Sequence, residues 1–258
     1  MNKFAFGENW NKYSKEIKQE DYIAAKDSLS TLIPDIENKT FLDVGCGSGL
    51  FSIAASALGA KEVVGIDVDP ESVETAKEML EKISKWDSDI NEDSISFRED
   101  SILDDNTPPE KFDIVYSWGV LHHTGDMYQA FDNVTANVKK KGKLVIAIYN
   151  KHFTSPVWKA IKFIYVKSPA FIQKLLVLSV AALKSIVGRL KGKAGSKKRR
   201  RGMHFYSDII DWVGGYPYEY ASIEEVCNFF EAKGFKTQKV NKTTGCTGCN
   251  EFLFDRVK

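Results

Sequence analysis

Three glycines alternate with other residues in FLDVGCGSGL, residues 41–50, and this spacing is suited to binding a small molecule. Gly45, Gly47 and Gly49 follow a short apolar run that ends at Asp43, and a run of helix-forming residues comes after them. Glycine has no Cβ and tolerates positive φ, so such a turn brings its backbone close to a ligand, and the amides of the next helix N-terminus face the bound molecule. The segment is therefore predicted to be a cofactor loop.

The spacing of these glycines excludes two common nucleotide-binding motifs. A dinucleotide-binding G-x-G-x-x-G loop needs a glycine where this chain has Leu50. A phosphate-binding loop ends in Gly-Lys-Ser or Gly-Lys-Thr, and no lysine occurs between Thr40 and Ala60. Another kind of cofactor is expected.

A second chemical signal lies in the next apolar run, which ends in a carboxylate. Residues 63–66 are predicted to form a strand, and Asp67 follows it directly. In an open α/β sheet, a residue at this end of a strand borders the ligand crevice, where an acidic side chain can accept both hydroxyls of a ribose. The ligand is therefore expected to contain a nucleoside.

With these two features the chain resembles the class I S-adenosylmethionine-dependent methyltransferases, and among them the ubiquinone and menaquinone methyltransferases. The first motif of that family matches LDVGCGSG, and its ribose-binding acid matches Asp67. The resemblance covers roughly the first 150 and the last 40 residues. It implies S-adenosyl-L-methionine as the cofactor and methyl transfer as the activity.

The resemblance also suggests how the cofactor is held. Asp100, after the third predicted strand, is expected to hold the adenine amino group, and the Ser117 carbonyl is expected to hold the amino group of the methionine part. The residues expected to bind the cofactor are Asp43, Gly45, Cys46, Gly47, Gly49, Asp67, Val68, Asp100, Ser101, Ser117, Trp10 and Tyr13.

Strands that alternate with helices predict a parallel sheet with right-handed crossovers. Strands are expected at 41–43, 63–66, 94–98, 111–118, 144–149, 235–240 and 251–254, helices at 70–82, 127–138, 170–191 and 223–233, and a turn at 139–143. The fold class is thus α/β, a Rossmann-like seven-stranded sheet with a helical insertion. The resembled family has one antiparallel strand near the C-terminus, which would be 251–254 here.

Three regions are expected along the chain. Residues 31–150 and 221–258 form the cofactor-binding core, and residues 151–220 form a basic, amphipathic helical insertion. Residues 1–30 contain the aromatic-rich FAFGENWNKY, which either folds over the cofactor as a lid or covers an edge of the core.

Methyl transfer from a sulfonium mainly requires an acceptor held in line behind the methyl group and the exclusion of water. For a hydroxyl or amine acceptor, a general base within hydrogen-bond reach helps. His122 and His123 follow the fourth predicted strand and are candidates for this base. The alternative is that one packs beneath its loop and the other caps the next helix.

A second candidate segment lies at 201–220. His204 and Asp208 are further candidates for catalysis, although the aspartate alternatively stabilises a helix N-terminus and the histidine lies on the surface. Aromatic residues of this kind are typical of a ligand pocket. The expected acceptor pocket consists of Tyr149, Trp212, Tyr216, Tyr218 and Tyr220.

The charge of the chain is unevenly distributed. Between Lys151 and Tyr206 there are 14 lysines and arginines and no acidic residue, whereas the rest of the chain carries a net charge of about −13. An amphipathic helix is predicted at 170–191, with an apolar face of Ile172, Leu175, Leu176, Ser179, Leu183, Ile186, Val187 and Leu190. The longest stretch of this helix without charge, 175–183, is too short to span a bilayer.

Three roles for this insertion are open. It lies on an anionic membrane and brings a lipid-linked acceptor to the site, or its basic run at 192–201 binds nucleic acid, or it packs as a lid or against a second copy in a homodimer. Nucleic acid is the less favoured partner, because SWGV at 117–120 replaces the Asn/Asp-Pro-Pro-Tyr motif of enzymes that methylate planar amide or base nitrogens.

Composition predicts a cytoplasmic enzyme, with the inner face of the membrane as an alternative location. Four cysteines do not suggest a disulfide framework, and the lone Cys246-x-x-Cys249 lacks further ligands for a metal. The N-terminus is too polar for a secretory signal. The predicted reaction is O-methylation of a small molecule or lipid-linked metabolite; the alternatives are an RNA methyltransferase and a cofactor-binding protein without methyl transfer.

Overall fold

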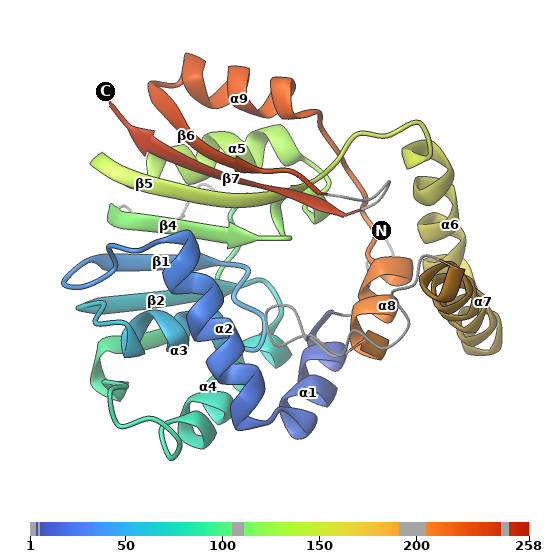
Figure 1. Cartoon of the computed structure of the whole chain (residues 1–258), viewed down its shortest axis with the longest axis horizontal. Helices are drawn as coiled ribbons and strands as arrows, with labels where there is room; N and C mark the ends of the chain where they lie inside the picture. The colour runs from blue at the N-terminus through green and yellow to red at the C-terminus, as the bar shows by residue number, and fades with distance from the viewer. Residues whose placement is uncertain (1–3, 5, 105–110, 191–204, 244–247, 258) are drawn as a thin grey trace.

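The computed structural model describes residues 4, 6–104, 111–190, 205–243 and 248–257. Within these residues, strands in the order β3-β2-β1-β4-β5-β7-β6 form one seven-stranded sheet, and β7 is antiparallel to both of its neighbours while the other pairs are parallel (Figure 1). The strands are β1 (Thr40–Val44), β2 (Glu62–Asp67), β3 (Ile95–Glu99), β4 (Phe112–Trp118), β5 (Val138–Tyr149), β6 (Phe235–Asn241) and β7 (Cys249–Arg256). The predicted fold class is confirmed, and β7 is the predicted reversed strand.

Helices cover both faces of this sheet (Figure 1). The helices are α1 (Phe6–Glu16), α2 (Gln19–Leu32), α3 (Leu50–Ala57), α4 (Pro70–Ile83), α5 (Met127–Ala136), α6 (Ser155–Lys167), α7 (Ala170–Leu190), α8 (Phe205–Gly214) and α9 (Ile223–Ala232). Successive residues of β1 point to opposite faces, so Phe41 packs with α2, α3 and α4 while Leu42 packs with α5 and α9. All five residues of β1 are buried, as expected for the centre of a parallel sheet.

Local capping signals place two of these helices. Asp69 caps α4 by accepting a hydrogen bond from the Glu71 amide at 3.0 Å, and Pro70 occupies the first helical position. Ser222 and Glu225 form the predicted capping box of α9, with reciprocal bonds of 2.7 and 3.1 Å. Both helices begin where the sequence predicts.

The turn predicted at 139–143 is wrong, because these residues belong to β5. Val138 pairs with Phe112 and Lys143 with Ile114, so the intervening residues form a bulge in the strand. The Lys139 ammonium binds the Asp113 carboxylate of β4 at 3.0 Å. This tertiary contact holds a lysine-rich segment in the sheet that its own composition would place in a loop.

Helices α6, α7 and α8 pack together on the side of the sheet where the parallel strands end (Figure 1). The helix predicted at 170–191 is confirmed through Leu190, but its predicted apolar face is not the face that packs on the rest of the protein. Leu175, Leu183 and Ile186 are exposed, whereas Val177 is buried. Apolar residues occupy most of the circumference of α7, so periodicity alone could not identify the side that packs.

Candidate active site

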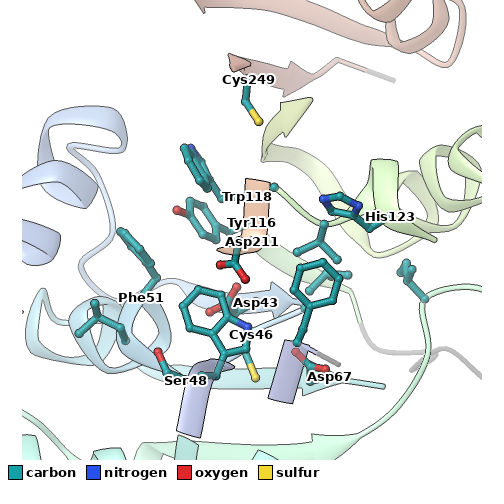
Figure 2. A pocket seen from close by; sticks show the side chains of 18 of the residues that line it. Asp43, Cys46, Ser48, Phe51, Asp67, Tyr116, Trp118, His123, Asp211 and Cys249 are labelled. Carbon is teal, nitrogen blue, oxygen red and sulfur yellow. The ribbon is translucent and has the colours of Figure 1, made fainter. Parts of the chain in front are cut away.

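A cavity of about 1430 Å³ opens at the carboxyl ends of the central strands. It is lined by Asp43 from β1, Asp67 from β2 and Trp118 from β4 (Figure 2). Tyr149 from β5 also lines it. Crevices at this edge of an open α/β sheet are the usual ligand sites of such folds. Its volume exceeds the 300–1,000 Å³ or so that is typical of a pocket for one small molecule, so it has room for a cofactor and an acceptor together.

The glycine loop forms the floor of this cavity and tolerates no side chain at its three glycines. Gly45, Gly47 and Gly49 have φ values of 72°, 54° and 73°, in the left-handed region. A Cβ on Gly45 would lie 2.4 Å from the Val120 side chain, and one on Gly47 would lie 2.8 Å from the Trp10 ring. Gly45 lines the cavity, whereas Gly47 and Gly49 shape the turn without lining it.

Two buried contacts fix the ends of this loop. The Gly45 and Cys46 amides both donate to the Ile66 carbonyl, at 2.8 and 2.9 Å, which ties the loop to β2. Ser52 donates to the Asp43 carboxylate at 2.7 Å, which ties the start of α3 to the end of β1. Cys46 also lines the cavity, and burial raises the pKa of its thiol well above the usual range. The thiol is therefore a small neutral wall group.

Asp67 is held rigidly at the cavity edge. Its carboxylate accepts the Gly47 amide at 2.9 Å on one oxygen and the Asp69 amide at 3.0 Å on the other. Burial raises the pKa of Asp67, and the two amide bonds partly offset that rise. Each oxygen keeps acceptor capacity, so the carboxylate can receive two hydroxyl groups of a ligand.

The wall beyond Asp67 combines polar and apolar residues. Asp100 and Ser101 line the cavity at the end of β3, and the Asp100 amide donates to the Asp67 carbonyl at 3.0 Å. Val68 also lines the cavity. Sequence analysis missed Ile102 and Leu103, which line the same wall and offer a flat ring an apolar surface. Their signal was the apolar pair directly after Asp100 and Ser101.

Ser117 lies beneath the wall. Its side chain is buried and donates to the Val44 carbonyl at 3.0 Å, which joins the ends of β1 and β4. The neighbouring Tyr116, Trp118 and Gly119 line the cavity.

Helix α1 closes one side of the cavity, with Trp10 and Tyr13 among the lining residues. The Gly7 amide donates to Asp69 at 2.9 Å, and the Asn9 side chain donates to Asp211 of α8 at 2.7 Å. Helix α1 therefore contacts both the cofactor-loop side of the cavity and the helical insertion.

The two adjacent histidines occupy different environments. His123 lines the cavity (Figure 2). Its Nδ1 lies 2.6 Å from the Pro217 carbonyl. A carbonyl only accepts, so Nδ1 carries the proton and Nε2 remains an acceptor. His122 is fully buried behind the wall, where its Nδ1 accepts the Tyr149 amide at 3.3 Å. Of the two candidate bases, His122 is displaced from the cavity because its ring packs beneath the loop.

Both histidines are held neutral. Burial lowers the pKa of His123 to about 3, with the Lys162 ammonium adding to the effect. Burial also lowers the pKa of His122 well below its usual value, with further contributions from His123 and Lys162.

Stability is therefore expected to fall on mild acidification. Below about pH 6.5 the unfolded chain binds protons at its histidines that the folded chain does not, so unfolding becomes more favourable as pH falls. Between pH 7 and 5, His123 alone accounts for about 2 kcal/mol of this loss. Urea unfolding of the wild type and His123→Gln at both pH values measures it, and the variant should lose less stability.

Two carboxyl groups with lowered pKa values act in a different pH range. The pKa values of Asp113 and Glu225 are lowered to about 2, so these groups add to acid destabilisation only below about pH 4.5. Equal losses in the wild type and in His123→Gln between pH 7 and 5 would contradict the assignment.

Three of the five aromatic residues expected in the acceptor pocket line the cavity: Tyr149, Trp212 and Tyr216. Tyr218 packs behind them with its ring 5.0 Å from that of Tyr149, and Tyr220 packs on Tyr218. These two were predicted as lining residues but form a supporting layer, because their rings pack on Tyr149 and on each other behind the wall.

The other two candidate catalytic residues cannot be placed beside the cavity. His204 lies outside the described residues, and Asp208 belongs to α8 with a side chain outside the described part. Asp211, one turn further along α8, lines the cavity.

Lys162 is a buried cation that sequence analysis missed. Its Nζ donates to the Trp212 carbonyl and lies 4.7, 4.9 and 5.4 Å from the ring centres of Trp212, Tyr218 and Tyr149. Such cation–π contacts are strongest when desolvated. Lys162 therefore fixes the aromatic wall from behind, and no local sequence pattern distinguishes it from the surface lysines of α6.

Cysteine and metal chemistry have little support in the part of the chain that the structure describes. No group of three or more histidine, cysteine or acidic residues there is close enough to hold a metal ion. Cys249 lines the cavity, and Cys246 lies outside the described residues.

Comparison with known proteins identifies the family. A family model described as "Methyltransferase domain" matches residues 16–239. A Methanocaldococcus jannaschii protein named provisionally as a protein N5-glutamine methyltransferase is 36% identical over 102 residues, which is 39% of this chain and 47% of that protein. The ribosomal protein L11 methyltransferase of Alteromonas mediterranea is 32% identical over 113 residues, 44% of this chain and 34% of that protein. The chain thus spans less than half the length of these relatives.

A solved structure shares the fold over nearly the whole chain. The magnesium protoporphyrin IX methyltransferase of Synechocystis, solved with bound SAH, has a TM-score of 0.58 and 14% identity and covers 96% of this chain and 93% of its own. The family match agrees with the order of the strands and with the cavity that the glycine loop and Asp67 line. The chain belongs to the methyltransferase domain family, as a class I enzyme that uses S-adenosyl-L-methionine.

Proposed function

We propose that this methyltransferase acts on an oxygen of a small-molecule or lipid-linked acceptor. The observation that supports this proposal is the aromatic wall of Tyr149, Trp212 and Tyr216 beside the acceptor nitrogen of His123. Aromatic walls with a few placed polar groups are typical of small-molecule pockets. The cavity is large enough to hold such an acceptor next to the cofactor.

The cofactor half would be bound by the residues at the strand ends. Asp67 would accept the two ribose hydroxyls, since both its oxygens are already fixed by backbone amides. Asp100 and Ser101 would contact the adenine side. The backbone at 45–49 would hold the methionine part, and the Ser117 carbonyl would hold its amino group.

We propose His123 as the residue that receives the acceptor's proton. The bound cofactor would supply its methyl group as an activated sulfonium and leave as the thioether, and Nε2 of His123 would accept the hydroxyl proton as the O–CH₃ bond forms. A pKa of about 3 makes this imidazole a weak base. The imidazole is basic enough to take the proton late in the methyl transfer, because a hydroxyl group whose oxygen is gaining a methyl group becomes much more acidic. His204 and Asp208 stay predictions.

The flanking regions would close the site. We propose that residues 1–30 act as a lid, because α1 contacts both Asp69 and Asp211, and that residues 151–220 form the acceptor side of the cavity. We place the enzyme in the cytoplasm, at or near the inner face of the membrane. The thiols of Cys46 and Cys227 agree with a reducing compartment.

A protein acceptor is the second candidate. The names of the curated relatives favour it, because they include protein and ribosomal protein methyltransferases. Those relatives match less than half of this chain, so they support the proposal of methyl transfer to protein only in part.

Incubation with methyl-labelled cofactor and a fractionated cell extract tests the acceptor class. Label is expected in the small-molecule or lipid fraction. His123→Ala should lower this incorporation at least about ten-fold, since a general base contributes about 10²–10⁴-fold, while cofactor affinity stays unchanged. The matched control is His152→Ala, whose histidine does not line the cavity.

Each alternative result has a clear meaning. Label in the protein fraction would favour the second candidate, and label in RNA would favour a nucleic-acid acceptor. Tight cofactor binding without label in any fraction would indicate a binding protein. Full activity of His123→Ala would place the proton acceptor elsewhere.

A further inference from the structure

One side of α7 carries an exposed apolar stripe. Phe171, Leu175, Leu178 and Ile186 are 73%, 63%, 48% and 54% exposed. Their spacing of four, three and eight residues places them on one face of the helix, and the exposed Ala182 lies in the gap. Large apolar groups exposed together in this way mark an interaction surface.

The opposite side of α7 is already occupied. Val177 is 3% exposed and packs in the cluster that contains Trp212 and Tyr149 of the cavity wall. The stripe is therefore not the face that attaches α7 to the rest of the protein. Only the width of α7 lies between the stripe and the acceptor half of the cavity.

The charged residues of the segment that carries the stripe are all basic. Residues 151–206 contain 14 basic residues and no acidic residue. Lys159, Lys167 and Lys174 are exposed on α6 and α7. A long lysine side chain can lay its methylene groups along an apolar surface and keep its ammonium in water. This combination is complementary to a surface that is apolar inside and anionic at its boundary.

Helix α7 does not have the properties of a spanning segment. Among the described residues, no helix is both long and apolar enough to cross a bilayer. Its 21 residues extend about 30 Å along the helix axis, with one apolar face free. A helix with these properties lies in the plane of the membrane interface and buries that face below the headgroups.

We propose that the stripe of Phe171, Leu175, Leu178 and Ile186 is the surface by which this protein docks on an anionic lipid bilayer. The docking deepens the proposed function, on which its purpose rests, since it places the acceptor half of the cavity one helix away from lipid-linked molecules. Nucleic acid fits the stripe less well, because four aliphatic and aromatic groups would be buried against phosphates.

Sedimentation with vesicles of phosphatidylglycerol and phosphatidylcholine tests the proposal with the full chain and without any acceptor. Wild type is expected to sediment with these vesicles and much less with pure phosphatidylcholine. The double variant Leu175→Glu/Leu178→Glu should partition at least about ten-fold less, because two apolar groups are lost and two negative charges are added. The matched control Ile23→Glu changes an equally exposed apolar residue on α2, and it should bind as the wild type does.

Further readouts separate a loss of docking from a loss of folding. Calorimetric affinity for S-adenosyl-L-methionine and the unfolding midpoint should be unchanged in the double variant, which keeps its fold and cofactor site. Phe171→Trp should show a blue-shifted emission on binding vesicles and quenching by brominated lipid.

Three results would overturn the proposal: no vesicle binding by the wild type, equal binding by the double variant, or a dimer of the wild type that the double variant converts to a monomer. The last result would assign the stripe to a second copy. Vesicle binding together with label in soluble metabolites alone would leave the docking surface in place and remove the lipid-linked acceptor.

Discussion

Replacing Asp67 with alanine should weaken binding of S-adenosyl-L-methionine by at least about ten-fold, and about 100-fold if the loop also loosens. Loss of charge-assisted hydrogen bonds to a ribose costs about 1.5–3 kcal/mol, and each 1.4 kcal/mol is a factor of ten in Kd. The same side chain accepts the Gly47 and Asp69 amides, so its removal also frees the turn that faces the ligand. Isothermal titration calorimetry measures the effect.

The control for this substitution is Glu99→Ala. Glu99 pairs with Asp67 in the register of β2 and β3, but it is exposed and does not line the cavity. Its loss removes one negative charge close by without removing a ligand group. Unchanged affinity in Asp67→Ala, or an equal loss in Glu99→Ala, would refute the ribose assignment.

Gly45→Ala should destabilise the protein by about 2–5 kcal/mol and greatly reduce cofactor binding. The left-handed φ of 72° costs an alanine about 1–2 kcal/mol, and the new Cβ would lie 2.4 Å from Val120, an overpacking that costs about 1–3 kcal/mol more. Relief of that contact moves the loop or Val120, both of which line the cavity. Chemical unfolding and calorimetry on the same preparation measure the two effects.

Gly125→Ala separates the cost of the left-handed backbone conformation from the cost of a steric clash. Gly125 has a φ of 88°, but its nearest neighbour for a Cβ is Pro217 at an ordinary 3.5 Å. This variant should lose only about 1–2 kcal/mol and bind the cofactor normally. If both variants behave alike, the close approach to Val120 has no role in shaping the site.

Features with local causes were predictable from the sequence. The glycine loop needs positive φ at fixed positions, which glycine supplies. Asp69 and Ser222 cap their helices through hydrogen bonds to residues two and three positions further along the chain. Burial on both faces makes the central strands continuous apolar runs. These signals sufficed for the sheet, the cofactor loop and Asp67.

Features decided by tertiary contacts were not predictable. The bulge in β5 depends on a lysine of that strand binding Asp113 in its neighbour. His122 and His123 are chemically identical and adjacent, and only the course of the backbone turns one of them into the cavity. Lys162 is buried by aromatic rings from three segments, so its own surroundings in the sequence give no sign of this environment.

Two hydrogen bonds hold helix α1 in place, one from the Gly7 amide to Asp69 and one from the Asn9 side chain to Asp211. The bond to Asp69 lies at the half of the cavity that suits the nucleoside, and the bond to Asp211 lies at the half with the aromatic wall. With α1 as the proposed lid, its opening would expose both halves, so the release of one product would weaken the enclosure of the other. We therefore expect the release of the two products to be coupled. We also expect the opening of α1, rather than methyl transfer itself, to limit the turnover rate.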